Sequence, residues 1–160
     1  MKPAFLAAAA LAMAGIGLAS CGDKGSQSSE AAPEAPAGIN VANGRLILPA
    51  VKGNPGAVYF DITNNGGKDT AIVGAFVDGA KSAMLHMTTN EGGMASMKEM
   101  DQVPVAKGET VKFAPGGNHV MAMDLDAAIQ KGDTTEVTLT FSDGEKVTFP
   151  ASVLAAGDAR

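Results

Sequence analysis

Short alternating runs of apolar and polar residues, each ended by a turn signal, limit residues 41–153 to a β fold. In Thr134–Phe141, the residues Val137, Leu139 and Phe141 share one face of a predicted strand, and an Asp-Gly turn follows. The predicted strands are Arg45–Leu48, Gly56–Thr63, Thr70–Val77, Ser82–Thr88, Met94–Met100, Thr110–Ala114, Asn118–Leu125, Thr134–Phe141 and Glu145–Phe149. Even spacing of this kind predicts an all-β fold, an antiparallel β-sandwich, with one short helical turn at Asp126–Lys131.

The first 20 residues have the pattern of a signal peptide. Lys2 supplies a positive charge, and residues 4–18 carry none. Fifteen apolar residues are too few for a transmembrane helix and fit the apolar region of a signal peptide. The following Leu18-Ala19-Ser20-Cys21 resembles a bacterial lipobox, which implies a lipid on Cys21 as the first mature residue. The alternative is an ordinary secretory signal with an unrelated cysteine.

The remaining boundaries follow from composition. Residues 21–40 are rich in Gly, Ser, Ala, Pro and Glu, and we expect a flexible tether because they contain too little apolar surface to fold. Residues 41–153 form the predicted β domain, and residues 154–160 form a short tail.

Charge and cysteine content exclude several classes of function. The formal net charge of −5 argues against nucleic acid, which binds to basic surfaces. A single cysteine cannot form an internal disulfide or a thiolate zinc site. A blue-copper centre also needs a thiolate, and Cys21 precedes the tether. No nucleophile motif with an orienting acid is evident, so we do not expect an enzyme.

Methionine and histidine gather in one window of the sequence. Seven of the nine methionines lie between Met84 and Met123, and both histidines, His86 and His119, lie there too. A hairpin with its tip between Glu91 and Gly92 would place His86 directly opposite Met97. That register is an assumption, and a slip of one residue would move Met97 to the other face.

The second half of the predicted site is a single strand. His119 and Met121 share one face and lie about 6.6 Å apart along it. Two imidazoles and two thioethers form a soft, neutral ligand set that favours Cu(I) over zinc or calcium. Met87 is a possible auxiliary ligand because it adjoins His86, although it faces the other side in this register. A single methionine in a strand usually fills the core, and a single histidine is usually a solvated or hydrogen-bonded side chain, so the hypothesis depends on the joint pattern.

The same residues resemble the motif of the PCuAC-domain periplasmic copper chaperones. In that motif a His and a Met are separated by ten residues, and a His-x-Met follows after twenty-one more. His86, Met97, His119 and Met121 match all four positions with this spacing. The resemblance covers about residues 40–150.

The resemblance implies a cupredoxin-like sandwich and a monomeric Cu(I) carrier of the bacterial periplasm. Its recipient would be a copper-accepting envelope protein, such as the CuA centre in subunit II of cytochrome c oxidase or an assembly factor. The lipobox implies attachment to a membrane. The alternative is a membrane-anchored envelope sandwich that has an interaction or structural role and transfers no metal.

Overall fold

A computed structural model of the chain describes residues 35–158. Within that range it contains strands and turns and no helix, which confirms the all-β prediction. The strands are β1 (Ile39–Ile47), β2 (Gly56–Asn64), β3 (Thr70–Val77), β4 (Ala80–Glu91), β5 (Met94–Glu99), β6 (Val103–Val105), β7 (Thr110–Phe113), β8 (Asn118–Leu125), β9 (Thr134–Phe141) and β10 (Lys146–Leu154). Among the described residues, no helix is long and apolar enough to cross a membrane.

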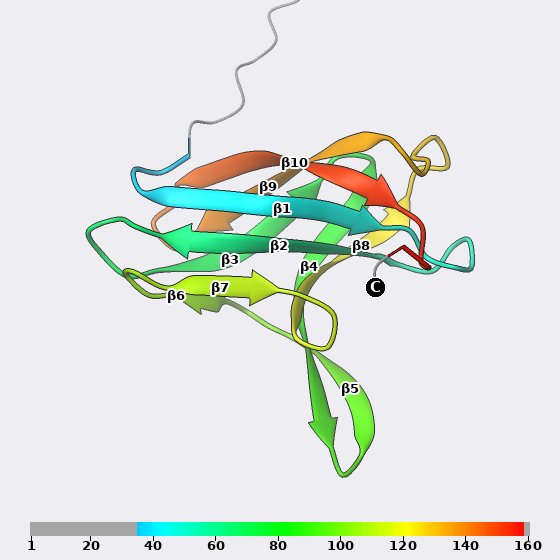
Figure 1. Ribbon diagram of the computed structural model, residues 1–160, viewed down its shortest axis with the longest axis horizontal. Helices are drawn as coiled ribbons and strands as arrows, with labels where there is room; N and C mark the ends of the chain where they lie inside the picture. The colour runs from blue at the N-terminus through cyan, green and yellow to red at the C-terminus, as the bar shows by residue number, and fades with distance from the viewer. Residues whose placement is uncertain (1–34, 159–160) are drawn as a thin grey trace, which may run out of the picture. The chain divides into compact units, whose positions relative to one another are not determined.

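The strands form one continuous sheet in the order β5-β4-β8-β7-β2-β1-β10-β9-β3-β6, and β8 also pairs with β2. Most pairs are antiparallel, as predicted, but β1 with β10 and β7 with β8 are parallel. The sheet bends so that its two halves enclose a single core (Figure 1). The β4–β5 hairpin extends beyond the other strands (Figure 1).

The core is built by strict alternation along the strands. Residues of β2 are buried and half-buried in turn from Gly56 to Asn64. At the centre, Phe60 stacks on Phe113 at 4.2 Å between ring centroids and contacts Phe149 at 5.1 Å. Stacked and tilted aromatic pairs add to the stabilisation from apolar burial. All ten strands lie between Ile39 and Leu154, so a fragment covering residues 22–160 contains the entire sheet.

The structure differs from three of the sequence predictions in detail. β1 begins at Ile39, so the last two residues of the predicted tether belong to the sheet. The three-residue strand β6 was not predicted because Pro104 interrupts so short a run. The predicted helical turn at Asp126–Lys131 is instead a pair of turns, the first of which is closed by the Asp126 carboxylate accepting from the amide of Ala128 at 2.9 Å.

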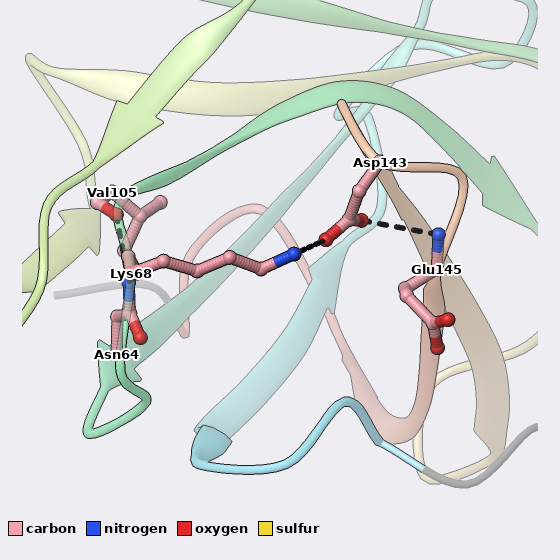
Figure 2. Close-up of polar contacts among 5 residues, drawn as sticks. All are labelled: Asn64, Lys68, Val105, Asp143 and Glu145. Atoms are coloured by element: carbon pink, nitrogen blue, oxygen red, sulfur yellow. Dashed lines mark hydrogen bonds and ion pairs between the residues drawn. The ribbon is translucent and has the colours of Figure 1, made fainter.

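A buried asparagine joins β2 to two other segments. The side-chain amide of Asn64 donates to the carbonyls of Lys68 at 2.9 Å and Val105 at 3.0 Å. Its oxygen accepts the amide of Gly66 at 2.9 Å. Figure 2 shows Asn64 beside Val105, with the chain continuing to Lys68. Asn64 is only 1% exposed, so the side chain supplies hydrogen bonds that water cannot.

A surface ion pair connects the same loop to the β9–β10 turn. Lys68 Nζ lies 2.9 Å from Asp143, whose carboxylate also accepts the amide of Glu145 at 3.2 Å (Figure 2). The hydrogen bond and charge of Lys68 lower the pKa of the Asp143 carboxyl. Because both side chains are in contact with water, the pair contributes little to stability.

We expect Asn64→Ala to lower the free energy of unfolding by about 2 kcal/mol, because it leaves the buried Val105 carbonyl and the part-buried Lys68 carbonyl without this donor. Urea denaturation of the fragment 22–160 measures the change. Asn65→Ala is the matched control, since Asn65 is exposed and adjacent. Equal losses in the two variants would show that the Asn64 side chain is not a structural link.

Candidate metal centre

The register of β4 against β8 places the two histidines opposite each other. Leu85 pairs with Val120, and both side chains are buried in the core. The next pair is His86 with His119, which lies on the other face of the sheet because successive side chains alternate. The two imidazole centroids are 5.9 Å apart and their planes are inclined by 39°.

Both ring nitrogens of His86 are buried, and they have no hydrogen-bond partner within residues 35–158. Buried polar atoms almost always have a partner, so an unsatisfied imidazole needs an explanation. Glu99 of β5 lies directly opposite His86, yet it forms no hydrogen bond with either nitrogen. The unprotonated nitrogen of neutral imidazole can bind a metal ion, and here no hydrogen-bond donor competes for it among the described residues, so the His86 ring fits a ligand.

His119 is held in one orientation by the backbone. The residue is 5% exposed, and Nδ1 of its ring lies 3.1 Å from the carbonyl oxygen of Gly117. A carbonyl only accepts hydrogen bonds, so Nδ1 carries the proton and Nε2 keeps its lone pair. The same carbonyl accepts the amide of Thr88 at 3.1 Å, which ties this turn to β4.

An aromatic ring and a cation extend this row of side chains across the sheet. The Tyr59 ring on β2 lies 6.3 Å from the His119 ring, and the guanidinium of Arg45 on β1 lies 5.3 Å from the Tyr59 centroid. Burial raises the pKa of the Tyr59 phenol, and the charge of Arg45 opposes that shift. The Tyr59 ring, in its protonated form, therefore lies beside one side of His119.

Two methionines form a second opposed pair beside the histidines. Met84 pairs with Met121, one step along the same face from His86 and His119, and both thioether side chains are half-buried. Met121 was predicted from its spacing to His119. Met84 was missed because the sequence alone does not give the β4–β8 register. Its position two residues before His86 was the only signal that could have suggested it.

The predicted register of the β4–β5 hairpin is wrong by two residues. Met97 pairs with Thr88, and His86 pairs with Glu99. The reason is the turn: Gly92 and Gly93 both have positive φ, at 62° and 83°, and together form the two-residue loop. A shift of two residues preserves the face, so Met97 is a diagonal neighbour of His86 rather than its opposite. Met97 is 63% exposed.

The remaining candidates are separate from this group. Met87 pairs with Asn118 and Lys98, and alternation places it on the face opposite His86. Cys21 lies outside the described residues.

A hollow of about 830 Å³ is lined by Leu48, Leu125 and other residues at the far end of β4 and contains neither histidine. Within residues 35–158, no three His, Cys, Asp or Glu side chains gather to hold a metal, so the histidines are accompanied by thioethers.

Solved structures define the class of this sandwich. The chain superimposes on the structure titled "Copper-bound PCuAC domain from PmoF2" with a TM-score of 0.61 and 23% identity, covering 74% of this chain and 93% of that one. It also superimposes on Cu(I)-bound DR1885 from Deinococcus radiodurans with a TM-score of 0.55 and 32% identity, covering 81% and 85%. The fold is therefore the cupredoxin-like fold of PCuAC domains, as predicted.

Sequence comparison gives the family. Residues 39–153 match the family described as "Putative lipoprotein LpqE-like", and this chain belongs to it. A relative from Leifsonia xyli subsp. xyli, named "Putative lipoprotein Lxx21020", is 38% identical over 98 residues. That alignment covers 61% of this chain and 58% of the relative, so the chain spans less than two thirds of the relative's length.

We expect the single tyrosine to ionise above the ordinary value of about pH 10, because burial disfavours the phenolate. A raised pKa in the folded state adds stability that is complete below about pH 10 and lost as the pH rises through the folded value. Ultraviolet absorbance of tyrosinate measures the midpoint without interference, since the chain has no tryptophan.

The contribution of Arg45 has the opposite sign and can be measured in the same titration. Arg45→Met should raise the Tyr59 midpoint further, because it removes the cation that favours the phenolate. Lys52→Met, on an exposed loop, is the control and should leave the midpoint unchanged. A midpoint that falls in Arg45→Met would contradict the arrangement.

Proposed function

We propose that this chain is a Cu(I) carrier of the bacterial envelope that binds the ion through His86, Met97, His119 and Met121. The observation that carries the proposal is the directly opposed pair of imidazoles, one of which has two buried nitrogens without a hydrogen-bond partner among the residues that the structure describes. The copper-bound state of a PCuAC domain and of DR1885, which share this fold, supports the choice of metal.

The chemistry of the donor set also favours Cu(I). Thioethers and imidazoles are soft or borderline donors, and both are neutral when they bind. Zinc sites use three or four thiolate, imidazole or carboxylate ligands, and within residues 35–158 no three His, Cys, Asp or Glu side chains lie together. Because all four proposed ligands are neutral, the copper-loaded site would carry only the single positive charge of Cu(I).

Each residue has a distinct part in binding. His119 is fixed by Gly117 with its Nε2 available, so it gives the ion a rigid nitrogen ligand. His86 supplies the second nitrogen from the facing strand. Met121 is half-buried beside them, and Met97 reaches the same face from the exposed hairpin. Binding and release involve ligand exchange alone, and we propose a stoichiometric carrier without catalytic turnover.

The open side of the site is the side from which a recipient would approach. Every residue of β5 is exposed, and Met94 and Met97 are 74% and 63% exposed. We therefore propose that a copper-accepting envelope protein contacts a monomer of this chain at the hairpin. The CuA centre in subunit II of cytochrome c oxidase and an oxidase assembly factor are the candidate recipients.

We also propose that a lipid on Cys21 attaches the chain to the membrane. The family description and the name of the Leifsonia relative both include the word lipoprotein. Removal of residues 1–20 would leave Cys21 as the lipid-bearing N-terminus, and residues before Ile39 would connect it to the sheet in the periplasm.

We expect the fragment 22–160 to bind one Cu(I) with two nitrogen and two sulfur neighbours. Anaerobic titration against a competing chelator, with X-ray absorption, measures the stoichiometry and the ligands. His86→Ala should weaken binding by about 100-fold or more, because losing a ligand costs at least as much as losing a group that orients one. Asn90→Ala, on the same face of β4 and exposed, is the control. Failure of the wild-type fragment to bind Cu(I) would leave the alternative of a sandwich without metal transfer.

Lipidation should depend on Cys21 alone, because it is the only cysteine. In cells, Cys21→Ser should abolish labelling by a fatty-acid analogue. In an unlipidated chain that begins at residue 21, the wild type and the Cys21→Ser variant should bind Cu(I) with equal affinity, since the described site contains no cysteine. A large loss of affinity in the variant would mean that the thiol reaches the ion.

A further inference from the structure

We propose that Met84 is an alternative sulfur ligand that replaces Met97 when the β4–β5 hairpin moves away, so that the ion keeps two nitrogen and two sulfur ligands until a recipient's donor displaces them. The inference rests on the proposed function and adds a residue to it. Its basis is the directly opposed pair Met84 and Met121 beside the pair His86 and His119.

The geometry places four donors at the corners of a small rectangle. Directly opposed side chains in an antiparallel pair have Cβ atoms about 4.5–5.5 Å apart, and residues two apart on a strand are separated by about 6.6 Å. Met84, His86, His119 and Met121 all project from one face, and all four are half-buried or buried. Flexible thioethers at two corners can reach an ion held between the imidazoles.

Met97 lies outside this rectangle. It opposes Thr88, whereas the pairing of β4 with β8 ends at Met87 and Asn118. Beyond that point β5 is the only neighbour of β4 among the described strands, and the hairpin extends beyond the rest of the sheet (Figure 1). A two-stranded hairpin without a third strand is only marginally stable, so it can move more readily than β8.

The exchange conserves the bonding of the ion. When the hairpin moves, the bond between copper and the Met97 sulfur breaks and a bond to the Met84 sulfur forms. Both donors are neutral thioethers, so no proton or electron is transferred and copper remains Cu(I). The space that the hairpin leaves then admits a donor from the recipient, while the ion stays bound to β4 and β8.

Sulfur counting in single and double variants of the fragment 22–160 tests this exchange. X-ray absorption of Cu(I)-loaded Met97→Leu should still give two sulfur neighbours, because Met84 supplies the second. Met84→Leu alone should also give two, from Met97 and Met121. The double variant should give one, and its affinity should fall by more than the product of the two single effects. Leucine approximates the volume of methionine, which keeps the sheet packed.

Three outcomes would overturn the proposal. Met97→Leu with one sulfur would show that Met84 does not reach the ion. A double variant with two sulfurs would show that another methionine replaces Met97. Single effects that multiply would show that the two thioethers act independently. Met94→Leu, exposed on the same hairpin, is the matched control and should change nothing. Absence of Cu(I) binding in the wild type is a different result, which rejects the proposed function itself.

Discussion

The register between β4 and β8 is the constraint on which both the core and the candidate site depend. Leu85 and Val120 pair on the inner face, and His86 and His119 pair on the outer face. Because side chains alternate, a slip of one residue would put imidazole into the core and leucine into water. The free energy of burying the apolar residues therefore also fixes the positions of the two facing imidazoles. The candidate metal site needs no separate folding energy to bring its strands together.

The site nevertheless has an energetic cost that the core must offset. Each buried polar group without a partner costs about 1–3 kcal/mol, and both nitrogens of His86 belong to this class. Folded domains are stable by only about 5–15 kcal/mol, so this cost would be a large fraction of the total stability if His86 had only a structural role. Under the proposed function, an ion bound to His86 would relieve part of that cost. The unsatisfied ring thus links ligand affinity to the stability of the empty domain.

Much of this arrangement could be predicted from the sequence because the signals are local. Alternation in stretches such as Thr134–Phe141 indicated the strands, and the spacing of His119 and Met121 indicated their shared face. Pairings between distant strands are not local, so the opposition of Met84 to Met121 could not be predicted. The hairpin register was wrong because two glycines with positive φ, rather than Glu91 and Gly92, form the loop. The short strand β6 lacks a sequence signal of its own.

The site is asymmetric in a way that suits a carrier rather than a permanent metal centre. On one side, His119 is clamped by Gly117, faces Tyr59 and is almost fully buried, so its position hardly depends on the ion. On the other side, Met97 is on an exposed hairpin that forms no pairing with β8 beyond Met87. A rigid half keeps the ordering cost of binding low, because those ligands are already in place. Under the proposed exchange, displacement of the β4–β5 hairpin would let a partner's donor enter without unfolding the sheet. In the proposed carrier, binding and release would therefore depend on different strands, β8 for the fixed ligand and β5 for the exchangeable one.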